Sequence, residues 1–362
     1  MSITTTAAVL RDPEAAYSIE EVTLADLGPT EVLVRLAGVG FCHTDVVARG
    51  MASYVLPAIL GHEGAGTVEA VGADVDRVSV GDPVIMSFAS CGACAQCAAA
   101  KPSYCALFTP LNMAARNLDG SATATDSEGG EIANRWFGQS SFAGRAVIDQ
   151  RGLVLVPAGT DLTKVGPLGC GIQTGAGTVL RAMNVQPGQS IVVFGAGAVG
   201  LAAVMAARIA GASDIVAVDL HQSRLDLALE LGATRTVLGS DRRLVDRITD
   251  DGAGLDFALD TTGVGSVMEA AIESVGPGGS VVLVAASEAA LEFHPTQLTG
   301  KSLSYVLEGG ADPQELIPYL LEQWREGRFP FDRLIATYPF RDIDQAEADA
   351  RSGAAIKPVL VF

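Results

Sequence analysis

The chain has 362 residues, of which 49% are hydrophobic and 18% are charged, and its formal net charge is −18. This length predicts about two domains, and so acidic a chain argues against nucleic acid or an anionic membrane as partner. The longest apolar run, 191–207, is too short to span a membrane, and residues 1–11 lack a secretory signal pattern. We therefore expect a cytoplasmic protein whose six cysteines stay reduced and serve as ligands or nucleophiles.

The first third of the chain has the pattern of short strands separated by glycine-rich turns. Alternating or β-branched residues predict strands at 31–38, 66–71 and 84–88. The segment 112–131 is rich in Gly, Ser, Thr and Asp, which is typical of a loop.

From about residue 189 the pattern changes to alternating strands and helices, which predicts an α/β domain with a doubly wound parallel sheet. A helix at 313–325 precedes a strand at 356–362, which we expect to return to the sheet of the first domain. The predicted organisation is a β-rich domain, 1–168 and 300–362, around an inserted α/β domain, 169–299. In the second domain we predict strands at 190–194, 214–219, 234–238, 255–260 and 280–285, with helices at 198–210, 223–231 and 266–275.

A glycine pattern, Gly195-x-Gly197-x-x-Gly200, lies between a predicted strand and a predicted helix. In a dinucleotide-binding loop these glycines allow the tight turn, the approach of the pyrophosphate and the packing of helix on strand. Asp219 ends the next strand, where a carboxylate can bind the ribose hydroxyls and repel a 2′-phosphate. The sequence therefore predicts NAD as cofactor. Arg224 nearby either softens the preference for NAD over NADP or is a solvated charge of the following helix.

Four cysteines, Cys91, Cys94, Cys97 and Cys105, lie within one short segment. Four thiolates at such spacing can close a tetrahedron around one zinc ion and hold a loop that lacks a core of its own. Two disulfides or an iron–sulfur cluster are the alternatives, and a reducing compartment favours zinc.

The two remaining cysteines, Cys42 and Cys170, lie far apart, with Gly61-His62-Glu63 between them in the sequence. Two thiolates, one imidazole and a water molecule make the open tetrahedral site that is typical of catalytic zinc. Spacing alone leaves open whether these residues converge, because buried cysteines and histidines are also common in ordinary cores.

These motifs, in this order, resemble the zinc-dependent alcohol dehydrogenases of the medium-chain dehydrogenase/reductase superfamily, and the resemblance covers essentially the whole chain. Within that family the chain most resembles the bacterial benzyl (aryl) alcohol dehydrogenases. The resemblance implies a GroES-like catalytic domain, a Rossmann domain and a homodimer or homotetramer. The resemblance to the superfamily rests on segments 42–45, 61–63, 91–105, 168–175 and 195–200. The resemblance to the benzyl alcohol dehydrogenases rests on segments 126–129, 139–143, 169–177, 327–332 and 357–358.

The resemblance also implies roles for the metal-site residues. Cys42, His62 and Cys170 would bind catalytic zinc, and Cys91 to Cys105 would bind a second, structural zinc. Asp45 would accept the other N–H of His62 and fix its tautomer. Glu63 would lie behind the metal, where it could exchange with the water ligand.

The implied reaction is reversible oxidation of a primary alcohol to an aldehyde by hydride transfer to NAD. Thr44 would take the proton of the alcohol. Many relatives end the proton relay with a histidine where this chain has Val47, so the outer end of the relay differs here. His43 would face the pyrophosphate, and Thr174 would lie near the nicotinamide and the substrate.

The resemblance further places Phe88, Trp136 and Phe137 around the substrate, and flat aromatic walls favour benzyl or allylic alcohols. Two alternative functions remain: a thiol-dependent formaldehyde dehydrogenase on the same scaffold, and a non-catalytic redox sensor that binds zinc and a dinucleotide. Activity that requires a small thiol would select the first. Absence of turnover despite bound zinc and NAD would select the second.

Overall fold

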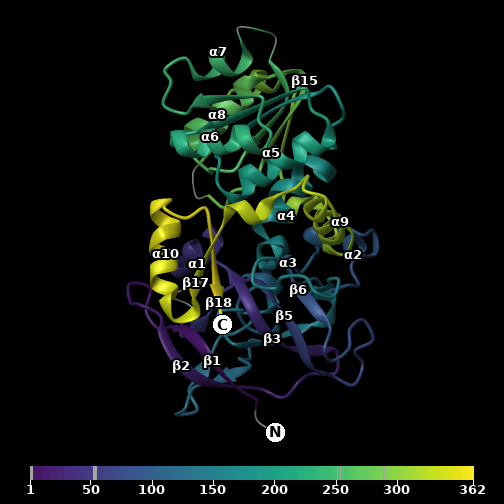
Figure 1. The fold of residues 1–362 in the computed structure, drawn as a ribbon, viewed down its shortest axis with the longest axis vertical. Coiled ribbons are helices and arrows are strands. Elements are labelled where there is room, and N and C mark those ends of the chain that lie inside the picture. Colours follow the sequence, from purple (N-terminus) through teal and green to yellow (C-terminus); the bar gives the residue numbers. More distant parts are fainter. Residues whose placement is uncertain (1–2, 52–54, 251, 253, 288–289) are drawn as a thin grey trace. The chain divides into compact units, whose positions relative to one another are not determined.

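The computed structural model describes residues 3–51, 55–250, 252, 254–287 and 290–362, which form two compact units (Figure 1). The first unit contains 1–170, 312–318 and 332–362, and the second contains 171–311 and 319–331. The sequence put the second boundary at 299/300. The second unit runs further because β16 (Ser302–Tyr305) still pairs with β15 (Val275–Leu283).

The first unit is built from two sheets that share no strand. The first sheet has the order β4-β1-β2-β7-β8, and the second has the order β10-β6-β5-β3-β18-β17, with β9 also paired to β3. Their strands are β1 (Ile3–Leu10), β2 (Ser18–Leu24), β3 (Glu31–Gly40), β4 (Ala58–Ile59), β5 (Glu63–Val71), β6 (Pro83–Met86), β7 (Ala124–Thr125), β8 (Glu131–Ile132), β9 (Arg145–Asp149), β10 (Leu153–Leu155), β17 (Ile335–Pro339) and β18 (Lys357–Val361).

Among the described residues, the α-helices that belong wholly to this unit are α1 (His43–Met51), α2 (Ala95–Ala98), α3 (Phe108–Asn112) and α10 (Ile343–Ser352). Helix α10 lies beside α1, and the C-terminal strand β18 pairs with β3, as the sequence predicts (Figure 1). The predicted loop 112–131 is largely irregular, with short strand pairing at 124–125 and 131–132.

The second unit has a six-stranded parallel sheet in the order β13-β12-β11-β14-β15-β16. Val192 and Val216, on its central strands, are fully buried, as expected for a parallel sheet covered on both faces. The remaining elements are α4 (Gly171–Gly177), β11 (Ser190–Phe194), α5 (Ala198–Ala210), β12 (Asp214–Asp219), α6 (Gln222–Leu231), β13 (Arg235–Leu238), α7 (Leu244–Thr249), β14 (Leu255–Asp260) and α8 (Gly265–Ser274). Helix α9 (Pro313–Arg325) follows later in the chain.

The predicted strands and helices of this sheet agree closely with the structure, except at β15. The sequence predicts that this strand begins at residue 280, but it begins at Val275. The register shifts between the Leu255–Val275 and Phe257–Ser280 pairs, so the glycine-rich stretch between them forms an irregularity inside the strand. Among the described residues, no helix is both long and apolar enough to cross a membrane.

Candidate metal centres and dinucleotide site

In the first unit, the sheet that contains β3 and β5 explains how Cys42 and His62 come together. Strands β3 and β5 are antiparallel, and Gly40 at the end of β3 pairs with Glu63 at the start of β5. Cys42 follows the first of these residues and His62 precedes the second. A Cβ on Gly40 would lie 2.0 Å from Glu63 Oε2, so only glycine leaves room for that carboxylate.

Cys170 reaches the same place through a tight glycine-containing turn, 166–169. A Cβ on Gly166 would lie 2.2 Å from the carbonyl oxygen of Glu63, and one on Gly169 would lie 2.1 Å from that of Met86. The Ser87 hydroxyl donates a hydrogen bond to the Gly169 carbonyl at 2.8 Å. The turn can therefore pack directly against β5 and β6 and carry the Cys170 sulfur to the ends of these strands.

The result is a buried cluster in which the donor atoms of Cys42, His62, Glu63 and Cys170 all lie within 4.8 Å of one another. The imidazole Nδ1 of His62 donates to Asp45 Oδ1 at 2.8 Å. Its Nε2 is buried and has no hydrogen-bond partner among the described residues. A buried, unsatisfied nitrogen beside two sulfurs is unfavourable unless something else binds it, so the donor set fits a zinc ion.

The charges in the cluster also fit a cation. Burial lowers the pKa of His62, but the negative charges of Asp45 and Cys42 outweigh burial and raise it well above its usual value. A hydrogen bond from Cys170 lowers the pKa of the Cys42 thiol, and the positive charges of Lys357 and His62 lower it further. The cluster therefore favours thiolate, which is the form that binds a metal ion.

The sequence did not reveal the partner of Glu63, which is Lys357. The Lys357 ammonium lies 2.9 Å from both carboxylate oxygens and donates to the Phe41 carbonyl at 3.3 Å. Burial raises the pKa of Glu63 against the opposing effect of Lys357, while Glu63 raises the pKa of Lys357 against burial. A lysine inside the apolar strand 356–362 was the available signal, but its partner lies 294 residues away.

The residues that follow Cys42 start helix α1 and differ in exposure. His43 is exposed, Thr44 is half-buried and Asp45 is fully buried. Thr44 Oγ1 lies 3.7 Å from the Cys42 sulfur, so its hydroxyl borders the cluster. Asp45 receives hydrogen bonds from the backbone N–H groups of Cys42 and Gly61 as well as from His62.

Aromatic rings cover one side of the cluster. The Phe137 ring stacks on the His62 imidazole with centroids 4.3 Å apart, and Phe108 connects Phe137 to Phe88 by ring contacts of 6.5 and 5.7 Å. Trp136 lies next to Phe137, and its indole Nε1 donates to Asp45 Oδ1 at 3.0 Å. All of these side chains are buried.

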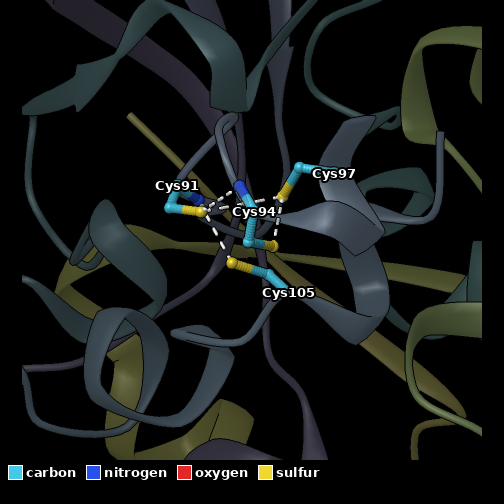
Figure 2. Close-up of side chains that lie close together, drawn as sticks. All are labelled: Cys91, Cys94, Cys97 and Cys105. Carbon is cyan, nitrogen blue, oxygen red and sulfur yellow. Dashed lines mark hydrogen bonds between the residues drawn. The ribbon is translucent and has the colours of Figure 1, made fainter. Parts of the chain in front are cut away.

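The second cysteine cluster is built locally. Figure 2 shows the sulfurs of Cys91, Cys94, Cys97 and Cys105 turned toward one another, with Cys97 coming from α2. The Cys91–Cys97 and Cys94–Cys97 sulfur distances are 3.9 and 3.6 Å. Four sulfurs at about 2.3 Å from one zinc ion stand about 3.8 Å apart in a regular tetrahedron, so the donor set fits zinc.

The alternatives for this cluster fit less well. All six cysteines are free thiols, so the cluster contains no disulfide. The four sulfurs lie within 4.8 Å of one another, which leaves room for one ion and not for several iron and sulfide atoms. Backbone N–H groups point at the sulfurs, and the N–H of Ala106 contributes most to lowering the pKa of Cys94 to about 6.

The glycine-rich loop has the geometry that the sequence pattern predicts. Gly195 has a left-handed φ of +90°, and a Cβ on Gly200 would lie 1.7 Å from the Gly195 carbonyl oxygen. A Cβ on Gly197 would meet nothing within 4 Å, so this glycine leaves open space beside the start of α5. In the described part of the chain, no side chain caps that helix, and its first N–H groups can bind a phosphate.

Asp219 lies at the end of β12 and contacts the glycine-rich loop. Its carboxylate accepts hydrogen bonds from the backbone N–H groups of Ala196 at 2.7 Å and His221 at 2.9 Å. Arg224 lies 3.7 Å from the same carboxylate. Thr174 is buried in α4 of the second unit.

Comparison with known proteins agrees with this geometry. The model of the family "Alcohol dehydrogenase GroES-like domain" matches residues 28–158, and the model of the family "Zinc-binding dehydrogenase" matches residues 198–322. Geraniol dehydrogenase of Castellaniella defragrans is 43% identical over 99% of this chain and 98% of its own length.

Solved structures give the same result. An alcohol dehydrogenase zinc-binding domain protein from Burkholderia ambifaria is 43% identical, with both chains fully covered and a TM-score of 0.97. Benzyl alcohol dehydrogenase from Acinetobacter calcoaceticus is 37% identical over 99% of both chains, with a TM-score of 0.95. The chain therefore belongs to the zinc-binding alcohol dehydrogenases of the medium-chain dehydrogenase/reductase superfamily, enzymes that use zinc and a dinucleotide.

Proposed function

We propose that this chain reversibly oxidises primary alcohols to aldehydes with NAD, and that its substrates carry an aromatic ring or a double bond next to the alcohol carbon. The observation that supports this proposal best is the buried cluster of Cys42, His62 and Cys170. The fourth member of the cluster, the carboxylate of Glu63, is paired with Lys357. Three protein ligands leave the fourth position of a tetrahedral metal to water or substrate, which is the arrangement of a catalytic site.

The proposal assigns two zinc ions to each chain. Cys42, His62 and Cys170 would hold the catalytic ion, and Cys91, Cys94, Cys97 and Cys105 would hold the structural one. Bound at the first site, zinc would supply a Lewis acid that lowers the pKa of an alcohol hydroxyl. Asp45 holds the imidazole of His62 in the tautomer that leaves Nε2 free for a metal.

Thr44 is the proposed acceptor of the alcohol proton. Its hydroxyl borders the Cys42 sulfur and can both accept and donate a hydrogen bond. Bound NAD would supply a hydride acceptor at its nicotinamide ring, and Thr44 would take the proton of the alcohol. Val47 has no group that accepts a proton, so water or a hydroxyl of the cofactor would have to complete the relay. His43 would face the pyrophosphate and Thr174 the nicotinamide.

The preference for aryl and allylic alcohols rests on two observations. Phe137 and Trp136 supply flat, buried aromatic surface next to His62, and Phe88 connects to Phe137 through the Phe108 ring. The relatives named geraniol dehydrogenase and benzyl alcohol dehydrogenase act, by their names, on an allylic and an aryl alcohol.

The preference for NAD rests on Asp219. Its carboxylate is fixed against the glycine-rich loop by two backbone N–H groups, and a fixed negative charge there opposes a 2′-phosphate. The positive charge of Arg224 reduces the repulsion of a 2′-phosphate, but Arg224 lies 3.7 Å from the Asp219 carboxylate and is partly neutralised by it. A higher kcat/KM with NADP than with NAD would contradict this part of the proposal.

The test is a screen of NADH formation with benzyl alcohol, geraniol and ethanol, together with a zinc count and the mass of the assembly in solution. We expect two zinc ions per chain, a dimer or tetramer, and kcat/KM at least about tenfold higher for the first two alcohols, since burying aromatic or allylic carbons contributes over 1 kcal/mol. Equal values would contradict the substrate class. A strict thiol requirement would favour formaldehyde dehydrogenase activity, and no turnover with zinc and NAD bound would favour a sensor.

A further inference from the structure

The turn at residues 136–139 contacts His62 from three directions. Its Phe137 ring stacks on the imidazole at an interplanar angle of 21°, and Gln139 Nε2 donates to the His62 carbonyl at 2.9 Å. The third contact comes from Trp136: its ring lies edge-on to the imidazole with centroids 6.4 Å apart, and its Nε1 donates to the carboxylate of Asp45, which in turn accepts the imidazole Nδ1–H of His62. The turn therefore reaches the ring face, the backbone and the hydrogen-bonded edge of one histidine.

The Asp45 carboxylate is the centre of this arrangement. Its Oδ1 accepts three hydrogen bonds, from Gly61 N at 3.1 Å, His62 Nδ1 at 2.8 Å and Trp136 Nε1 at 3.0 Å, and its Oδ2 accepts one from Cys42 N at 3.2 Å. The carboxylate has no solvent contact, so its charge depends on these donors. The indole is the donor that comes from a distant part of the chain, 91 residues away.

The position of the indole is itself fixed by the turn. The backbone N–H of Trp136 donates to Ser140 Oγ at 2.9 Å, and that hydroxyl donates to the Ile59 carbonyl at 2.7 Å. Phe137 has a left-handed φ of +51°, which is unfavourable for a phenylalanine and persists only where the surroundings enforce it. The turn is thus anchored close to Gly61 and His62 independently of the indole.

We propose that Trp136 is a positioning residue for the metal ligand His62: through Asp45 its N–H fixes the plane and tautomer of the imidazole, so that Nε2 is presented to the metal. The inference rests on the proposed function in one respect, the assignment of His62 as a zinc ligand. This inference adds a hydrogen-bonding role to Trp136, which is otherwise proposed only as aromatic surface beside the substrate. Phenylalanine at this position would keep the flat ring and remove the donor.

The first test compares Trp136→Phe with Trp324→Phe, a matched control at the other tryptophan of the chain. Release of zinc to a coloured chelator is followed in time, with the wild-type zinc count measured first. Loss of a group that orients a ligand typically weakens metal binding 10- to 100-fold. We expect one of the two zinc ions to leave Trp136→Phe about 10- to 100-fold faster, while Trp324→Phe releases both as the wild type does.

The same variants separate positioning from substrate contact. A positioning role predicts that kcat falls while the ratio of kcat/KM for benzyl alcohol to that for ethanol changes by less than about twofold, because both substrates need the same metal site. Unchanged zinc release together with a shifted ratio would overturn the proposal and leave Trp136 as a wall only. Unchanged zinc release and unchanged kinetics would overturn it as well.

A second measurement uses the wild-type chain and does not depend on the folding of a variant. With two tryptophans, a protein labelled with 15N-tryptophan gives two indole N–H signals, and Trp324→Phe assigns them. We expect the Trp136 indole proton to exchange slowly with solvent and its signal to shift when zinc is removed. Fast exchange and a signal unaffected by zinc removal would contradict the contact with Asp45. This readout needs no alcohol turnover, so it is separate from a failure of the proposed function.

Discussion

The two cysteine clusters of the first unit differ in how the chain builds them. Cys91 to Cys105 come from one short segment, three of them are only half-buried, and backbone N–H groups of the same segment point at their sulfurs. Cys42, His62 and Cys170 come from three distant segments and are all buried. Asp45 accepts hydrogen bonds from the His62 imidazole and the Cys42 backbone N–H, and the neighbouring Glu63 is paired with Lys357.

The difference indicates whether the metal ion orders the protein or the protein positions the metal ligands at each cluster. The segment 91–105 contains little buried apolar surface, so a metal ion would supply much of its folding free energy. The distant residues are already brought together by paired strands and glycine turns, so the fold positions the donors before a metal arrives. Metal loss should therefore affect local folding at the first cluster and chemistry at the second.

The largest expected effect separates the two clusters directly. Cys170→Ala removes one ligand of the proposed catalytic site, and the metal contributes several kcal/mol of transition-state stabilisation. We expect kcat to fall by at least about 10³-fold, with one zinc ion retained per chain. Steady-state kinetics and zinc counting measure both quantities.

The matched control is Cys97→Ala in the other cluster. It should also remove one zinc ion, but kcat of the folded fraction should stay within about tenfold of wild type while protease cleavage within 91–105 becomes faster. Equal losses of kcat in the two variants would contradict the division between structural and catalytic clusters.

The next effect tests how the fold maintains the second cluster. Lys357→Met leaves the carboxylate of Glu63 buried without its counter-ion, and breaking such a pair costs about 3–5 kcal/mol. The double variant Glu63→Gln, Lys357→Met removes both charges and should recover most of that stability. Urea unfolding measures the difference, and a double variant as unstable as the single one would exclude charge as the cause.

The stability loss of the single variant Lys357→Met should depend on pH. Without Lys357 the folded-state pKa of Glu63 rises further above its ordinary value of 4.5, because burial raises it and the ammonium no longer opposes burial. Any stability loss from this charge is absent below pH 4.5 and grows as the pH rises toward the folded-state pKa. We expect Lys357→Met to be least destabilised relative to wild type near pH 5 and more so at pH 8.

A smaller effect concerns the proton acceptor. Thr44→Val keeps the shape of the side chain and removes the hydroxyl beside Cys42. General acid–base groups contribute about 10²- to 10⁴-fold, so we expect kcat to fall about 10²-fold with zinc content unchanged. A kcat close to that of wild type would exclude Thr44 from the relay.

The smallest effect concerns the aromatic wall. Phe137→Leu removes an aromatic surface worth about 0.5–1.5 kcal/mol to an aryl substrate. We expect the benzyl-to-ethanol ratio of kcat/KM to fall about 2- to 10-fold. A decline of both substrates by the same factor would instead indicate that Phe137 acts through its stacking on His62.

Much of the fold could be predicted because its signals are local. Gly195 to Gly200, Asp219 and the β-branched strands of the parallel sheet each lie within a short stretch with a recognisable pattern. The irregular start of β15 depends on pairing with β14, which a pattern within one strand does not contain.

The parts of the site that the sequence missed depend on long-range contacts. Lys357 on β18 pairs with Glu63 on β5 across the intervening strand β3, and the Trp136 indole reaches Asp45 through a turn whose geometry depends on Ser140 and Ile59. Residue type indicated that Cys42, His62 and Cys170 can bind zinc. The register of β3 and β5 explains why the first two meet, and the turn at 166–169 explains how Cys170 joins them.

The central claim is that three side chains from distant segments hold a metal ion with one open position. Crystals of the protein, measured above and below the zinc absorption edge, test it directly. We predict two anomalous peaks per chain, one of them about 2.0–2.3 Å from the Cys42 and Cys170 sulfurs and His62 Nε2, with Glu63 still paired to Lys357. A single peak at Cys91 to Cys105, or Glu63 bound as a fourth protein ligand, would contradict the account.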